Sequence, residues 1–125
     1  MKPANASEGR GISIVDDLRD VVIDDTSVIQ RYITNPLLIN GHKFDLRIYV
    51  VVTCYEPLRV YVYKEGLARF ASESYSTKAS KNNQYMHLTN YSINKKNDNF
   101  VANENIENDD VGFKWSLTAF CNHLE

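Results

Sequence analysis

The stretch Gln30–Asp45, QRYITNPLLINGHKFD, runs without a break into LRIYVVVTCY and decides the fold. Side chains alternate along a strand, so the segment KFDLR places Lys43, Asp45 and Arg47 on one face. Unpaired buried charge is costly, which argues against a strand buried on both faces. The pattern predicts the floor of a polar cleft that offers two cations and a carboxylate to a phosphorylated or multiply charged ligand. A cross-strand ion pair at a sheet edge is the alternative.

The hydrophobic periodicity predicts several short strands and one helix. The strands are expected at residues 12–15, 28–33, 43–55, 58–64, 67–72 and 87–93, and the helix at 111–124. Turns at Glu56-Pro57 and at Glu65-Gly66 would join three of these strands into an antiparallel meander. The predicted fold class is therefore α+β, dominated by antiparallel sheet.

Composition excludes some classes of partner. The chain has 125 residues, 43% of them hydrophobic, which is enough to bury one core. Its 14 basic and 16 acidic residues leave no basic footprint for nucleic acid. No apolar run approaches the length of a membrane span, so we expect no membrane partner. Cys54 and Cys121 lack metal-binding spacing and predict reduced thiols in an intracellular protein.

Four motifs in order carry a resemblance to a known family. They are QRYI at 30–33, KFDLRIYV at 43–50, YVYKEGLARFAS at 61–72 and HLTNYSINK at 87–95. Together they resemble the tubulin tyrosine ligase-like family, a branch of the ATP-grasp ligases, over nearly the whole chain. The last two motifs are most similar to the polyglutamylase members.

The resemblance implies a partial ATP-grasp fold, mainly antiparallel sheet with a truncated C-terminal helix. Residues 1–29 would be the end of the central lid subdomain with its phosphate loop. Residues 30–125 would be an incomplete part of the C-terminal subdomain. The abrupt start at Met1 and the helix that runs to the chain end predict a fragment of a longer ligase.

The resemblance also assigns residues to ATP. They are Lys2, Gly9, Arg10, Gly11, Gln30, Arg31, Tyr32, Ile33, Lys43, Phe44, Asp45, Thr89 and Asn90. Glycines let backbone N–H groups approach phosphate oxygens, although the first loop, taken alone, is equally a simple turn. Backbone amides and a glutamine side chain suit the edge of adenine, although QRYI alone is an ordinary strand end.

A second set concerns the amino-acid substrate. Arg69 lies between small and apolar residues in GLARFAS, which predicts a guanidinium aimed into a pocket, where its fork holds a carboxylate. The family binds the incoming amino acid at this position, and Ser92 and Lys114 are further candidates for contacting glutamate. Arg47 and Arg69 are the predicted catalytic cations, because negative charge builds up between the γ-phosphate and the acceptor. His87 is interpreted as structural.

The predicted cofactors are ATP and Mg²⁺. No metal ligand is assigned within the chain, because the acidic residues after Asp98 lie in an asparagine-rich loop typical of solvated charge. The magnesium ligands are expected beyond Glu125.

The function implied is ATP-dependent ligation of free L-glutamate to glutamate side chains of tubulin C-terminal tails on microtubules, through an acyl-phosphate. The alternatives are a glycine or tyrosine ligase of the same family, or a non-catalytic relative that binds nucleotide or microtubules. The expected location is the cytoplasm and cytoskeleton, with the cilium or basal body as a further candidate.

Overall fold

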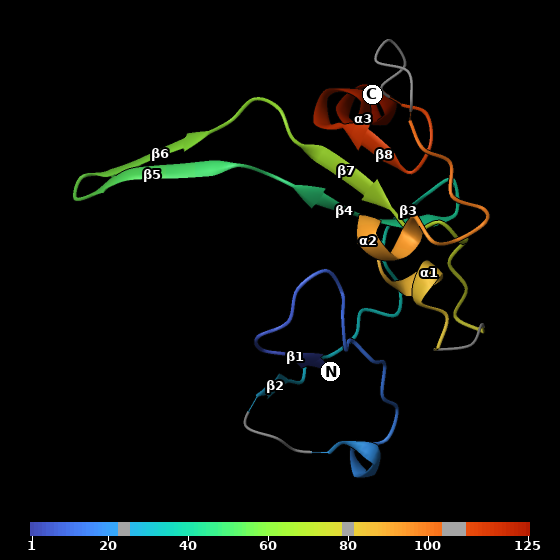
Figure 1. Ribbon diagram of the computed structural model, residues 1–125. Helices are drawn as coiled ribbons and strands as arrows, with labels where there is room; N and C mark the ends of the chain where they lie inside the picture. The colour runs from blue at the N-terminus through green and yellow to red at the C-terminus, as the bar shows by residue number, and fades with distance from the viewer. Residues whose placement is uncertain (23–25, 79–81, 104–109) are drawn as a thin grey trace.

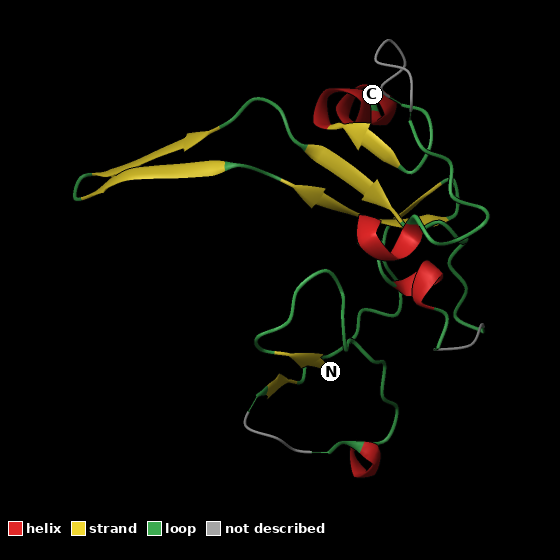
Figure 2. Ribbon diagram, viewed as in Figure 1, coloured by secondary structure: helices red, strands yellow, loops and turns green. Residues whose placement is uncertain are grey.

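The computed structural model describes residues 1–22, 26–78, 82–103 and 110–125. A small N-terminal unit lies beside a central body, from which a long two-stranded arm projects (Figure 1). Every strand pair in the described ranges is antiparallel, and short helices accompany the strands (Figure 2). The predicted α+β class is therefore confirmed. None of the described helices is long and apolar enough to cross a membrane.

The central body is built on a four-stranded sheet in the order β3-β4-β7-β8. Its strands are β3 (Leu38–Ile39), β4 (His42–Arg47), β7 (Leu67–Phe70) and β8 (Lys114–Ser116). The register places Asp45 opposite Arg69, and Arg69 opposite Lys114. Since neighbours in register point to the same face, these three side chains form one row across the sheet.

The opposite face of this sheet forms the core. Phe44 packs against Phe70 and Phe120 with ring centroids 5.8 and 5.1 Å apart, and Phe70 packs against Trp115 at 4.7 Å. Phe120 comes from α3 (Leu117–Leu124), which covers this face. Burying each large apolar side chain contributes roughly 1.5–3 kcal/mol, so the sheet is held by this layer. The polar row is thereby left on the face away from α3.

The predicted strand over 43–55 breaks after Arg47. Its second half, β5 (Val50–Tyr55), pairs with β6 (Leu58–Val62), and these two strands make the arm. A Cβ on Gly66 would lie 2.5 Å from the Arg47 carbonyl oxygen, so the two backbones approach closely only because residue 66 is glycine. The turn predicted at Glu56-Pro57 is confirmed at the arm tip, where the peptide bond is cis.

The meander predicted at Glu65-Gly66 is wrong, because the chain does not reverse there. Val50 faces Val62 in the arm, and Arg47 faces Leu67 in the central sheet. Both pairs belong to one long hairpin whose two sides bend together, and β7 therefore pairs with β4 and not with β6. Turn-forming residues mark a bend here.

The N-terminal unit holds β1 (Lys2–Pro3), β2 (Ser27–Val28) and a 3-10 helix, η1 (Leu18–Asp20). The strand predicted at 12–15 is wrong, because those residues are irregular. The strand predicted at 28–33 is wrong beyond Val28. Both segments contribute apolar side chains to the lining of a cavity, where Ile29 and Ile33 stay 53% and 71% exposed, so their hydrophobicity reflects a cavity lining and not strand pairing.

The strand predicted at 87–93 is also wrong, since the chain forms α1 (Gln84–His87) and α2 (Tyr91–Asn94). The Asn83 side chain caps α1 by accepting a hydrogen bond of 3.1 Å from the Tyr85 amide. The helix predicted over 111–124 begins only at Leu117, after β8. Ser116 caps it, its hydroxyl oxygen accepting a 3.0 Å hydrogen bond from the Ala119 amide.

Candidate functional site

A cavity of about 900 Å³ lies between the N-terminal unit and the central sheet. Its size falls within the roughly 300–1,000 Å³ of small-molecule sites. Seven of the residues assigned to ATP from the sequence line it: Lys2, Gln30, Arg31, Tyr32, Ile33, Lys43 and Phe44. These residues come from three separate segments, and the fold brings them to one hollow.

The walls of the cavity combine apolar surface with positive charge. Ile12, Ile14 and Val28 are among the apolar side chains that line it, and Lys2, Arg31 and Lys43 are its lining cations. Within the described ranges, the backbone of residues 30–33 makes no backbone–backbone hydrogen bond, so its N–H and C=O groups are open to a ligand. Such a hollow suits a ligand with a flat apolar part and an anionic part.

Lys43 is the most firmly held cation of this cavity. Its ammonium donates to the His87 carbonyl oxygen at 2.9 Å and to the Tyr32 hydroxyl oxygen at 3.3 Å, and lies 4.8 Å from the Tyr32 ring centroid. Burial lowers the pKa of Lys43, and the negative charge of Asp45 partly opposes this shift. The half-buried ammonium therefore has two hydrogen-bond partners within the protein.

The glycine loop (residues 7–11) contacts the segment HLTN and the start of α2. A Cβ on Gly9, whose φ is +80°, would lie 2.5 Å from Ile93 Cδ1 and 2.9 Å from Asn90 Oδ1. The Ser92 hydroxyl donates a 3.0 Å hydrogen bond to the Glu8 carbonyl oxygen. The loop and the HLTN segment thus lie side by side, and Ser92, assigned to the amino acid from the sequence, holds the loop in this structure.

The remaining predicted ATP contacts lie outside the lining of the large cavity. They are Gly9, Arg10, Gly11, Asp45, Thr89 and Asn90. Arg10 is exposed and pairs with Glu8 at 2.8 Å. Asp45 lies in the polar row of the sheet, one residue beyond Phe44, which does line the cavity.

Asn94, which fixes the HLTN segment, was not predicted from the sequence. Its side-chain oxygen accepts from the Ser72 amide at 2.8 Å and from the Ser72 hydroxyl at 2.7 Å. Its side-chain amide donates to Leu88 O at 2.7 Å and to Asn90 O at 3.0 Å. All four hydrogen bonds that an asparagine side chain readily makes are formed, on both sides of Thr89. Because asparagine is abundant in this part of the chain, composition did not distinguish the buried one.

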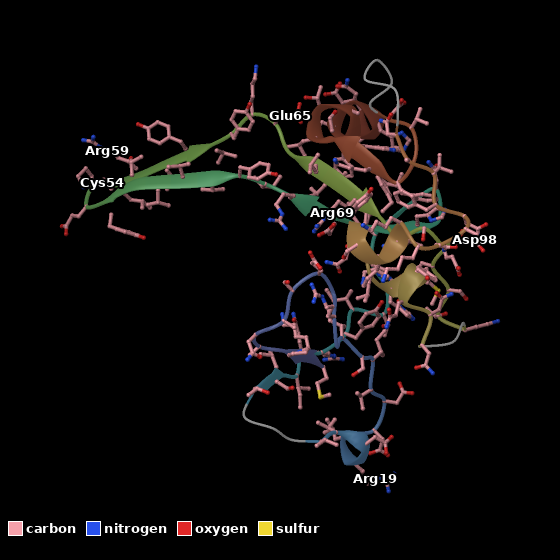
Figure 3. All side chains as sticks on the ribbon, viewed as in Figure 1. Arg19, Cys54, Arg59, Glu65, Arg69 and Asp98 are labelled. Atoms are coloured by element: carbon pink, nitrogen blue, oxygen red, sulfur yellow. The ribbon has the colours of Figure 1, made fainter. Side chains whose placement is uncertain are left out.

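Arg69 forms an ion pair with Asp45 across the sheet. Arg69 Nε donates to Asp45 Oδ1 at 2.9 Å, and Nη2 donates to Oδ2. The hydrogen bonds to Asp45 raise the pKa of Arg69. Figure 3 shows Arg69 on β7, facing away from the α3 side of the sheet. The cross-strand ion pair considered as an alternative from the sequence is thus present between Asp45 and Arg69.

The other predicted substrate and catalytic residues flank this pair. Lys114 is exposed and lies next to Arg69 in register, and Arg47 is exposed at the end of β4. Strand alternation puts Arg47 on the same face as Asp45. The sheet therefore carries four cations (Lys43, Arg47, Arg69 and Lys114) and the Asp45 carboxylate on one face, and Arg69 is already paired with Asp45.

The described residues contain no group of three or more His, Cys, Asp or Glu side chains arranged to hold a metal ion. The acidic segment 104–109 lies outside the described residues.

Comparison with known proteins agrees with the resemblance of the motifs. The sequence model of the tubulin-tyrosine ligase family matches residues 1–125. A tubulin polyglutamylase of Caenorhabditis elegans is 48% identical over 127 positions, covering 100% of this chain and 17% of that protein. A tubulin polyglutamylase of Mus musculus is 46% identical, covering 100% of this chain and 10% of the relative. A tubulin monoglutamylase of Mus musculus is also 46% identical, and the match covers 99% of this chain and 10% of that relative.

The chain therefore spans a tenth to a sixth of the length of these relatives. Its mixture of short helices and antiparallel sheet agrees with a partial ATP-grasp fold of this family.

Proposed function

The chain belongs to the tubulin-tyrosine ligase family, and on this premise we propose that it supplies the nucleotide cavity and amino-acid face of an ATP-dependent tubulin glutamate ligase. The reaction joins the amine of free L-glutamate to glutamate side chains in tubulin tails. Relatives named as tubulin polyglutamylases and monoglutamylases, 46–48% identical to this chain, support glutamate as the amino acid and tubulin as the acceptor.

The observation that carries the proposal is the lining of the 900 Å³ cavity. Residues 30–33 offer open backbone groups for adenine, and Lys2, Arg31 and Lys43 offer charge for phosphates. ATP, when bound, supplies the phosphoryl group that activates the acceptor carboxylate as an acyl-phosphate. Cations fixed beforehand around a site where negative charge grows lower the barrier, because they need no reorganisation at the moment of reaction.

On the polar face of the sheet, we assign glutamate to Arg69 and Lys114. The Nε/Nη2 edge of Arg69 is occupied by Asp45, which leaves the Nη1/Nη2 edge for a substrate carboxylate. Arg47, further along the same face, is the second cation that we assign to the developing charge. Ser92 is assigned to the glycine loop and not to glutamate, because its hydroxyl is bonded to Glu8.

The remaining assignments extend this proposal. Residues 1–29 act as the end of the central subdomain and residues 30–125 as part of the C-terminal subdomain of the ATP-grasp fold. Magnesium accompanies ATP. The acceptor places the protein on microtubules in the cytoskeleton, including those of cilia and basal bodies.

The test is a chimera in which residues 1–125 replace the aligned segment of the Caenorhabditis elegans relative. The chimera is expected to incorporate radiolabelled glutamate into purified tubulin with ATP and magnesium, and to incorporate glycine or tyrosine no faster than a blank without enzyme. Incorporation of glycine or tyrosine in place of glutamate would assign the chain to another ligase of the family. Failure to incorporate any amino acid, with the chimera folded and the parent active, would refute the ligase proposal.

A further inference from the structure

The Tyr32 side chain, assigned to adenine from the sequence, contacts Lys43 and His87 in the structure. Its hydroxyl oxygen receives a hydrogen bond from the Lys43 ammonium at 3.3 Å and lies 2.8 Å from His87 Nδ1. The Tyr32 and His87 rings meet edge to face with centroids 5.5 Å apart. Tyr32 is thus fixed by His87 on one side and fixes Lys43 on the other.

We propose that Tyr32 and His87 are positioning residues that hold the Lys43 ammonium at the cavity wall, ready for the anionic part of the nucleotide. The inference rests on the proposed nucleotide site and adds how its central cation is aimed. All three residues line the cavity.

Lys43 is already ordered by contacts within the protein. A lysine side chain loses rotamer entropy when it is fixed. Lys2 and Arg31 are exposed, whereas Lys43 is half-buried with its ammonium bonded at two points. A cation that is ordered before the ligand arrives avoids this loss on binding.

The Lys43 ammonium carries three N–H donors and accepts no hydrogen bond. One donates to the His87 carbonyl oxygen and one to the Tyr32 hydroxyl. The described contacts therefore leave the third N–H for a phosphate oxygen of a ligand in the cavity that Lys43 lines.

The neighbours of Tyr32 keep its hydroxyl neutral and in place. Burial and a hydrogen bond with Tyr75 raise the pKa of Tyr32, so its hydroxyl stays neutral and is a hydrogen-bonding group and not an anion. The Tyr75 hydroxyl is itself bonded to the Thr34 carbonyl oxygen at 3.0 Å. Tyr32 is thus locked into one place by neighbours from several segments, as a positioning residue requires.

The experiment is a double-mutant cycle on the 125-residue chain. ATP affinity is measured by NMR titration for the parent, Tyr32→Phe, Lys43→Met and the double variant, with adenosine as a second ligand. Tyr32→Phe keeps the ring and removes only the hydroxyl. Tyr61→Phe, an exposed tyrosine of the arm, is the matched control.

Tyr32→Phe is expected to weaken ATP binding roughly five- to tenfold when Lys43 is present, and to have no further effect in the Lys43→Met background. Adenosine affinity should not change, because adenosine has no phosphate. His87→Leu should act in the same direction and should not add to Tyr32→Phe. If the losses of ATP affinity in the cycle are additive, or if Tyr32→Phe also lowers adenosine affinity, the proposal is wrong. A loss of adenosine affinity would mean that Tyr32 contacts the adenine.

A second readout does not depend on nucleotide. The pKa of Lys43 is followed through its ¹³Cε chemical shift as the pH is raised. Tyr32→Phe removes an acceptor that stabilises the ammonium, so the Lys43 pKa is expected to fall further, while Tyr61→Phe leaves it unchanged. An unchanged Lys43 pKa in Tyr32→Phe would overturn the positioning role. Failure of the parent chain to bind ATP would instead count against the proposed nucleotide site.

Discussion

The ion pair between Asp45 and Arg69 determines what the polar face of the sheet is able to bind. A free guanidinium has two edges that each match a carboxylate, and Asp45 occupies one of them. Asp45 also fixes the direction of the other edge, because the two hydrogen bonds prevent rotation of the guanidinium. An arginine that is already paired thus remains suited to a second carboxylate, and a lysine in its place would not be.

Arg69→Lys is therefore expected to lower glutamate use by the chimera roughly ten- to a hundredfold, since the loss of a charge-assisted hydrogen bond costs about 1.5–3 kcal/mol. ATP affinity should change little. The measurement is the rate of radiolabelled glutamate incorporation into tubulin. Arg59→Lys at the arm tip is the matched control, and Figure 3 shows that it lies far from Arg69. Incorporation by Arg69→Lys at the parental rate would remove Arg69 from the substrate site.

The open backbone groups of residues 30–33 lead to a prediction about nucleotide choice. Adenine presents a donor beside an acceptor on its edge, and guanine presents them in the reverse order. A site that pairs with one order leaves buried groups unpaired with the other, which costs about 1–3 kcal/mol. ATP should therefore bind at least roughly fivefold more tightly than GTP. Competition between the two nucleotides for the chimera measures this ratio, and equal affinities would contradict adenine recognition by residues 30–33.

Helix α3 depends on a residue far from it in the sequence. The Glu65 carboxylate accepts from the Gly66 amide at 2.9 Å, and from the Thr118 hydroxyl at 2.7 Å and the Thr118 amide at 3.2 Å (Figure 3). A negative charge at a helix N-terminus is favourable. These contacts, led by the Gly66 amide, lower the pKa of Glu65 below its ordinary value of 4.5.

Glu65→Gln is expected to lower the melting temperature at neutral pH. Because the pKa is lower in the folded than in the unfolded protein, the stabilisation is complete above pH 4.5 and is lost as the pH falls through the lowered pKa. The two proteins should therefore melt at similar temperatures at strongly acidic pH. Trp115 fluorescence reports the unfolding, since this buried residue is the single tryptophan of the chain. Glu56→Gln at the arm tip is the control, and an equal loss in both variants would contradict the role of Glu65.

Short apolar runs were the least predictable part of the fold. The alternation of side-chain type from one residue to the next predicted the strands β4 to β7, because successive side chains of a strand point to opposite faces. The run at 12–15 and the run after Val28 have the hydrophobicity typical of strands, although they line a cavity. The motif HLTN was taken for a strand, although the side chains of Asn83 and Asn94 bond locally to backbone and favour helical turns. Local hydrophobicity does not distinguish these cases.

Seven of the thirteen residues assigned to ATP from the sequence line the cavity, whereas the contacts among the lining residues were not predicted. The segments that meet at the cavity were identified from the sequence, since each carries polar residues in a characteristic motif. The partners within the site were not, because Tyr32, Lys43 and His87 are separated by as many as 55 residues. The pairing of Asp45 with Arg69 depends on the register of β4 and β7, which the incorrect meander did not provide.

The fold brings together the glycine loop and the start of α2, which lie far apart in the sequence. The hydrogen bond between Ser92 and Glu8 spans 84 residues, and the fit of Gly9 against Ile93 supports it. The glycine loop is therefore held against the residues that follow His87, whose carbonyl oxygen accepts a hydrogen bond from Lys43.

The arm exposes a continuous row of apolar side chains. One of its faces carries Val50, Val52, Val60 and Val62, which are between 42% and 62% exposed. Register pairs Val50 with Val62 and Val52 with Val60, so the four side chains form one continuous patch. Two-stranded ribbons are marginally stable in water, and an open edge with an apolar face favours association.

Replacing these four valines with threonine is therefore expected to reduce both self-association and binding of an apolar dye by the 125-residue chain. Threonine is close to valine in shape and also favours strands, so the arm should keep its pairing. Trp115 emission should not change, because the core lies on the other side of the bend, between the sheet and α3. The measurements are light scattering and dye fluorescence. Val101→Thr with Val111→Thr, two exposed valines outside the arm, is the control. An equal reduction in the control, or unchanged dye binding in the fourfold variant, would mean that the apolar surface open to the dye lies elsewhere.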